Sequence, residues 1–185
     1  MATERDRITY QDYLQLPEES RYEVLEGDLK MVPAPGHRHQ QLVGRIYRVL
    51  AGQVDEKGLG EVNIAPFDVI LSDDTVVQPD LLVVMTENLG IIAPEGVRGA
   101  PDLVVEVLSP GTAKRDRGIK RHLYGRHGVR EYWIIDPDGL TVEVAVNQGG
   151  HMETCGVFGA GDRVESQVLF GLDLMVDVLL AGPAR

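Results

Sequence analysis

The stretch Leu103-Val104-Val105-Glu106-Val107-Leu108 consists almost entirely of β-branched and apolar residues. Such a run is typical of a strand that is buried on both faces of a sheet. Residues 112–127 then have the pattern of a helix, with Gly128 placed to cap its carboxyl end. A second apolar stretch, residues 131–135, follows the helix. The order strand, helix, strand predicts a βαβ crossover between two parallel strands.

The segments on either side of this unit add further helices and strands. Helical patterns cover residues 9–16, 38–54 and 174–180, and strand patterns cover 21–32 (a hairpin), 61–85, 140–146 and 151–158, while 86–100 has the pattern of a loop. We therefore expect an α/β (α+β) fold. One mixed central sheet would be flanked by helices on both faces, and an antiparallel meander would form its carboxyl-terminal part.

The composition is that of an ordinary globular chain. Its 185 residues, 43% hydrophobic and 25% charged, predict a single domain over residues 1–185. The single cysteine, Cys155, excludes an intrachain disulfide and a cysteine cluster for zinc. The charged start predicts no signal peptide, and no apolar run is long enough to span a membrane. These features predict a cytoplasmic protein without a membrane partner.

The chain is acidic overall but contains one strongly basic segment. A formal charge of −11 argues against a generic nucleic-acid-binding protein, which is usually basic. Residues 112–130, however, hold seven lysines and arginines against one acidic residue, Asp116. A basic stripe on an acidic body can still contact a phosphate backbone locally, although long-range steering would be weak.

Glu106 is the residue that the strand pattern does not explain. A buried carboxylate is costly to ionise, so it is normally paired with a cationic side chain or bound to a metal. Asp80 stands at the start of another apolar stretch, Pro79-Asp80-Leu81-Leu82-Val83-Val84. If the two strands are neighbours, both carboxylates converge on one cation. Oxygen ligands of this kind suit Mg²⁺ or Mn²⁺.

Three further residues are candidates for the same site. Lys120 lies at the border of the buried face of the predicted helix, where it could turn toward the end of the Glu106 strand or pair with Asp116 four residues earlier. Glu23 could face inward from the hairpin or lie on the surface. His39 opens the long helix, where it could contact phosphate, transfer a proton or be an ordinary polar residue.

An ordered set of short motifs resembles a known family. The set comprises Tyr22-Glu23-Val24-Leu25-Glu26-Gly27, His39, Pro79-Asp80-Leu81, Glu106-Val107-Leu108-Ser109-Pro110, the trio Asp116, Lys120 and Tyr124, and residues 128–136. Between about Thr9 and about Leu180 the chain resembles the bacterial Uma-type restriction endonuclease family. That family is similar to the PD-(D/E)XK nucleases, so the resemblance implies a restriction-endonuclease-like fold.

The resemblance also implies a site. A metal, Mg²⁺ or Mn²⁺, would be held by Asp80, Glu106 and the backbone carbonyl of Val107, with Glu23 nearby. The lysine that the superfamily carries two residues after the acid is here Leu108. The resemblance suggests that Lys120, on the following helix, replaces it. The predicted catalytic residues are therefore Asp80, Glu106, Lys120 and Glu23.

The function that follows is metal-dependent hydrolysis of a phosphodiester bond in DNA. His39, Arg115, Arg117 and Arg121 would contact the nucleic acid, the arginines by gripping its backbone. Cleavage of a duplex would suit a homodimer by symmetry. Two alternatives stay open: a non-catalytic nucleic-acid-binding or assembly domain that keeps the nuclease fold, and a metal-dependent hydrolase of small phosphate esters.

Overall fold

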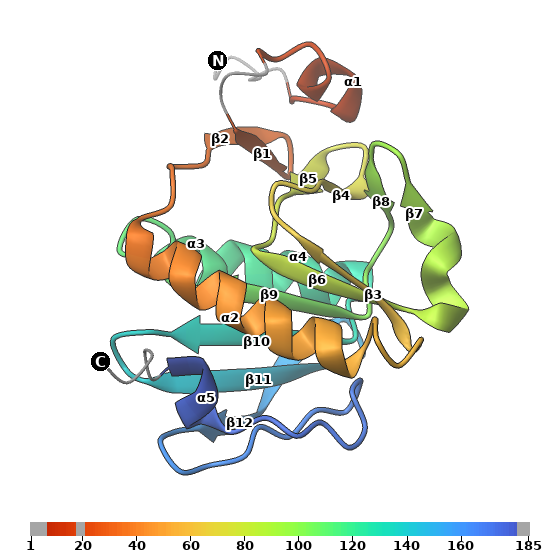
Figure 1. Ribbon diagram of the computed structural model, residues 1–185. Coiled ribbons are helices and arrows are strands. Elements are labelled where there is room, and N and C mark those ends of the chain that lie inside the picture. The colour runs from red at the N-terminus through yellow and green to blue at the C-terminus, as the bar shows by residue number, and fades with distance from the viewer. Residues whose placement is uncertain (1–6, 18–20, 181–185) are drawn as a thin grey trace.

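The computed structural model describes residues 7–17 and 21–180. Within these ranges the strands form two mixed sheets. One six-stranded sheet has the order β12-β11-β10-β9-β6-β3, and the other has the order β2-β1-β5-β4-β8-β7 (Figure 1). The predicted mixed central sheet is confirmed in the first of these, with its antiparallel meander at β10, β11 and β12. The second sheet was not predicted.

The helices and strands follow one another along the chain in a fixed order. In order they are α1 (Tyr10–Tyr13), β1 (Tyr22–Leu25), β2 (Asp28–Met31), α2 (His37–Gln53), β3 (Gly60–Ile64), β4 (Val69–Ser72), β5 (Thr75–Val77), β6 (Leu81–Met85), η1 (Thr86–Ile91), β7 (Ile92–Ala93), β8 (Gly96–Arg98), β9 (Leu103–Val107), α3 (Ala113–Arg115), η2 (Asp116–Lys120), α4 (Arg121–His127), β10 (Glu131–Asp136), β11 (Thr141–Gln148), β12 (His151–Phe158) and α5 (Val176–Leu180).

The predicted crossover lies at the centre of the first sheet. Strands β9 and β10 run parallel, with Leu103 opposite Glu131 and Val107 opposite Ile135. On its other side β9 pairs antiparallel with β6, so that Leu81 lies opposite Val105. This confirms that the strands near Asp80 and Glu106 are neighbours. Asp80 itself lies one residue before β6 begins.

Alternate residues of the central strands face two different cores. Leu103, Val105 and Val107 pack with residues of α2, such as Ile46 and Leu50. Val104 instead packs with Leu123 and other residues of the α4 side. Figure 1 shows α2 crossing one face of this sheet while α3 and α4 lie at the other. Glu106 shares its face with Val104, so the period of the strand directs its carboxylate toward the α4 side.

The helix predicted at 112–127 is present but is not a regular α-helix. Its middle turn, η2, is a π turn between α3 and α4. Such turns occur mostly as single insertions and often at functional sites. Both end residues of this turn, Asp116 and Lys120, are buried. Gly128 caps α4 with φ 93°, the left-handed conformation that favours glycine, as expected.

The prediction of a loop at residues 86–100 is wrong. This segment contains the 3₁₀ helix η1 and the short strands β7 and β8. Strand β8 pairs in parallel with β4 and thereby joins the second sheet. Strands of two and three residues are too short for a hydrophobic period, which is why the pattern did not reveal them. Across the part of the chain that the structure describes, no helix is long and apolar enough to cross a membrane.

Candidate active site

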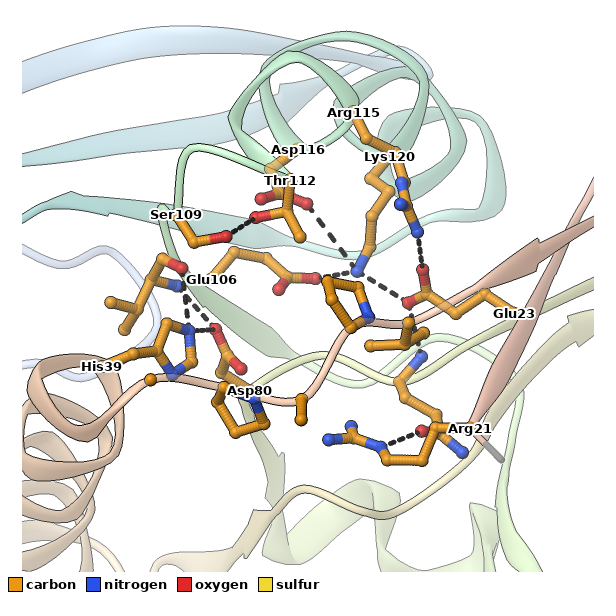
Figure 2. A pocket seen from close by; sticks show the side chains of 17 residues that line it. Arg21, Glu23, His39, Asp80, Glu106, Ser109, Thr112, Arg115, Asp116 and Lys120 are labelled. Atoms are coloured by element: carbon orange, nitrogen blue, oxygen red, sulfur yellow. Dashed lines mark hydrogen bonds and ion pairs between the residues drawn. The ribbon is translucent and has the colours of Figure 1, made fainter. Parts of the chain in front are cut away.

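A pocket collects polar side chains from elements that are distant in the sequence. It is lined by Glu23 of β1, His39 of α2, Asp80 before β6, Glu106 of β9 and Lys120 of η2. Figure 2 shows these side chains pointing toward one another. The structure therefore brings together the five residues that the sequence singled out.

Glu106 lies at the bottom of the pocket, with 4% of its surface exposed. Its Oε1 accepts a hydrogen bond of 2.8 Å from the Tyr124 hydroxyl and forms an ion pair with the Lys120 ammonium. Burial raises the pKa of Glu106 well above its usual range, and the carboxylates of Asp116, Asp80 and Glu23 add to this effect, whereas Lys120 opposes it. The ionised form of Glu106 is therefore costly in this pocket.

Lys120 is the cation at the centre of these carboxylates, and it is itself 3% exposed. Its Nζ lies 2.8 Å from Glu23 Oε1 and 4.0 Å from Asp116 Oδ1, in addition to the ion pair with Glu106. Burial alone would lower the pKa of Lys120, but the Glu106 and Glu23 carboxylates raise it well above its usual value. The ammonium thus stays charged, and its pairing with Asp116 is the longest of its three contacts.

Glu23 holds Lys120 from the second sheet. Its Oε1 also accepts a hydrogen bond of 2.9 Å from the backbone N–H of Gln78, and its Oε2 lies 3.1 Å from Arg115 Nη1. Burial raises the pKa of Glu23, but Lys120, the Gln78 N–H and Arg115 together outweigh burial and lower the pKa. Glu23 is therefore an ionised carboxylate that fixes both cations.

A second group of polar atoms surrounds the end of β9. The backbone N–H of Val107 donates a hydrogen bond of 2.8 Å to Asp80 Oδ2. His39 Nε2 lies 3.1 Å from the same oxygen and 3.0 Å from the carbonyl oxygen of Val107. Because a carbonyl can only accept, Nε2 carries a proton in this arrangement. Burial lowers the pKa of His39, but the hydrogen bond and charge of Asp80, the Val107 carbonyl and the charge of Asp116 together outweigh burial and raise the pKa.

The donor chemistry of the pocket fits a hard divalent cation. Asp80, Glu106 and the Val107 carbonyl offer oxygen atoms at adjoining positions of neighbouring strands, and such oxygens are the ligands that Mg²⁺ prefers. Within residues 7–17 and 21–180, no three His, Cys, Asp or Glu side chains form a ready metal site by themselves. A metal here would therefore need the backbone carbonyl as well as the carboxylates.

The basic residues predicted to contact nucleic acid do not all lie here. Arg115 lines the pocket. Arg117 and Arg121 lie outside it and pair with Glu143, at 2.8 Å and 2.6 Å respectively. Asp102, another aspartate that follows a proline, is buried elsewhere and accepts a hydrogen bond of 2.8 Å from the backbone N–H of Met85.

Sequence reasoning missed some residues of the site. Arg21 lines the pocket (Figure 2) and donates a hydrogen bond of 2.9 Å to the side chain of Gln78. A lone arginine before a hairpin carries no signal of such a role. Tyr124 was named in the motif set with Asp116 and Lys120, but no role in the site was predicted for it.

Comparisons with known proteins identify the family and the fold. The model of the Uma2 family, described as "Putative restriction endonuclease", matches residues 10–178. A solved structure from Anabaena variabilis ATCC 29413, titled a putative nuclease belonging to DUF820, is similar with a TM-score of 0.78 and 25% sequence identity, covering 94% of this chain and 97% of that one. A comparison with curated proteins finds no match. The family match spans most of the sequence, and the chain therefore belongs to the Uma2 family of restriction-endonuclease-like proteins and has a nuclease fold.

Proposed function

We propose that this protein is a metal-dependent endonuclease that hydrolyses phosphodiester bonds of DNA. The observation that carries the proposal is the position of Lys120, whose buried ammonium lies between Glu106 and Glu23. A lysine beside a pair of acids at a strand end is the arrangement that the resemblance to PD-(D/E)XK nucleases implies. Here the helix after the strand supplies that lysine.

Each side chain of the pocket has a separate proposed role. Asp80, Glu106 and the Val107 carbonyl would hold Mg²⁺ or Mn²⁺, and a bound cation of this kind polarises a phosphoryl oxygen and acidifies a water molecule. Lys120 would donate a hydrogen bond to the attacking water or to the phosphate, where negative charge develops during the reaction. Glu23 would keep that ammonium in position through its 2.8 Å contact.

The cationic residues at the pocket suit a phosphate ester. Arg21 and Arg115 line the pocket together with the deeper acids. Arg115 lies 3.1 Å from Glu23, so it is already oriented toward the reacting centre. These two guanidinium groups would contact phosphate oxygens of the substrate. Cleavage of a duplex in both strands would then require two such pockets, as a homodimer provides.

One observation favours a second candidate, the hydrolysis of a small phosphate ester. Arg117 and Arg121 both pair with Glu143, so contact with a DNA backbone would have to replace these ion pairs. Together with the net charge of −11, this lowers the affinity that we expect for long nucleic acids.

A panel of substrates separates the candidates. The protein is incubated with supercoiled plasmid, circular single-stranded DNA and bis(p-nitrophenyl) phosphate, each with Mg²⁺, Mn²⁺ or EDTA. We expect metal-dependent nicking of a DNA circle, with a rate that falls steeply as salt rises because phosphate contacts release counterions. Turnover of the small diester alone, without salt dependence, would favour the second candidate. No turnover of any substrate with either metal would favour a non-catalytic domain.

A further inference from the structure

Two pairs of atoms at the end of β9, which share His39 Nε2, have the spacing of neighbouring metal ligands. His39 Nε2 lies 3.1 Å from Asp80 Oδ2 and 3.0 Å from the carbonyl oxygen of Val107. At the metal–ligand distance of about 2.1 Å that Mg²⁺ keeps, neighbouring ligands of an octahedral site lie about 3.0 Å apart. The two oxygens belong to the proposed metal site, and the imidazole nitrogen lies at the same spacing from both.

We propose that His39 is a direct ligand of the divalent metal, through Nε2. The ligand set then comprises the imidazole nitrogen, Asp80, the Val107 carbonyl and Glu106. This inference rests on the metal site of the proposed function. It assigns to His39 the part of a ligand, in place of a contact with nucleic acid or a proton transfer.

The surroundings of the ring allow this change of role. In the structure Nε2 carries a proton, because the Val107 carbonyl can only accept. To bind a metal, Nε2 must present its lone pair, and the single proton of the neutral ring then moves to Nδ1. Among the described residues, Nδ1 is buried and has no hydrogen-bond partner. No hydrogen bond at Nδ1 therefore has to break when the proton moves there.

Glu106, which lines the same pocket, would complete the set. Its Oε1 is engaged by Tyr124 and Lys120. The carboxylate therefore has to offer its other oxygen or shift when a metal binds. This explains why no group of three acidic or imidazole side chains in the described ranges is already arranged as a metal site, although Asp80 and His39 are close together.

A nitrogen ligand changes which metal the site prefers. Imidazole suits transition metals, whereas Mg²⁺ prefers oxygen ligands. The site is therefore selective for Mn²⁺ over Mg²⁺ beyond what carboxylates alone would give. Replacing the imidazole with an amide removes the nitrogen ligand and reduces this selectivity.

Electron paramagnetic resonance of bound Mn²⁺ tests the assignment directly. Mn²⁺ is titrated into the full chain, its dissociation constant is measured, and pulsed spectra are examined for coupling to a ¹⁴N nucleus. His39→Gln keeps a hydrogen-bond donor beside Asp80 and Val107. His37→Gln, an exposed histidine on the same helix, is the matched control. Thermal unfolding verifies that both variants are folded.

We expect ¹⁴N coupling in the wild type and in His37→Gln, and its loss in His39→Gln, with Mn²⁺ binding weakened at least about tenfold and Mg²⁺ binding changed less. Mn²⁺ binding that is lost in Asp80→Asn but shows no ¹⁴N coupling, and that is unchanged in His39→Gln, would overturn the assignment while leaving the metal site intact. Failure of the wild type to bind Mn²⁺ would overturn both. Coupling without cleavage of any DNA would uphold His39 as a ligand and refute the nuclease.

Discussion

Replacing Lys120 with methionine should destabilise the protein far more than replacing Glu106 with glutamine. Methionine keeps most of the buried volume but removes the ammonium that lies 2.8 Å from Glu23 Oε1 and is paired with Glu106. Glu23 and Glu106 are both buried, so neither carboxylate can be solvated instead. Removing one partner of a buried ion pair costs about 3–5 kcal/mol. We expect a loss of this size at pH 7, a large part of the stability of a typical domain.

The glutamine variant should behave differently because the pocket has more carboxylates than Lys120 can neutralise. Burial and the neighbouring acids raise the pKa of Glu106, so its ionisation costs stability in the wild type. In Glu106→Gln that cost is removed, while Lys120 keeps its contact with Glu23. We expect the free energy of unfolding to stay within about 1 kcal/mol of the wild type or to rise.

The stability difference between Lys120→Met and the wild type should depend on pH. The pKa of Glu106 is higher in the folded protein than in the unfolded protein, so protonation of Glu106 favours folding. This contribution to the free energy of unfolding is fully present below the unfolded pKa and is lost as the pH rises through the folded pKa. The lowered pKa of Glu23 contributes stability above its unfolded pKa, and this contribution depends on Lys120. The deficit of Lys120→Met should therefore shrink as the pH falls below neutrality.

Urea unfolding at a series of pH values measures all three proteins, with a constant m-value as the check on two-state behaviour. A deficit of Lys120→Met that does not vary with pH would contradict the reasoning. A Glu106→Gln variant as unstable as Lys120→Met would also contradict the reasoning. That result would show that the ion pair between Lys120 and Glu106 determines stability and that the excess of carboxylates does not.

Three other variants test neighbouring parts of the structure. Tyr124→Phe removes the hydroxyl that donates to Glu106, so Mn²⁺ binding measured by calorimetry should weaken about 10–100-fold. The Tyr132 hydroxyl donates to a backbone carbonyl, so the control variant Tyr132→Phe should bind Mn²⁺ as the wild type does. Glu131→Gln disrupts a fully buried acceptor of four hydrogen bonds; a loss of about 2–3 kcal/mol and faster amide exchange at residues 167–168 would follow. Gly128→Ala forces a side chain into φ 93° and should cost about 1–2 kcal/mol in thermal unfolding, while an unchanged melting temperature would mean that the cap relaxes.

The central crossover could be predicted because buried parallel strands leave a direct pattern in the sequence. Strands β9 and β10 are buried over almost their whole length, so their residues are almost continuously apolar. Glu106 departs from that pattern and was recognised for this reason. The short strands β7 and β8 leave no such pattern, because their pairing depends on residues far away in the chain.

The same distinction holds for the site. The helical stripe placed Lys120 near the end of β9, since local geometry decides which face a helical residue occupies. The contact between Lys120 and Glu23 spans 97 residues and joins η2 to the second sheet, and the sequence contains no local sign of it. His39 likewise meets the Val107 carbonyl across 68 residues, so its position beside the predicted metal ligands came from the fold alone.

The most direct test of the central claim is the nicking of supercoiled plasmid by Asp80→Asn and by Asp102→Asn, beside the wild type, with Mg²⁺ or Mn²⁺ and with EDTA. Both aspartates follow a proline, but only Asp80 lines the pocket, whereas Asp102 contacts Met85 and Arg130 elsewhere. The account predicts metal-dependent nicking by the wild type, its loss in Asp80→Asn, and its retention in the folded fraction of Asp102→Asn. Nicking that persists in a folded Asp80→Asn, or that does not need a metal, would contradict it.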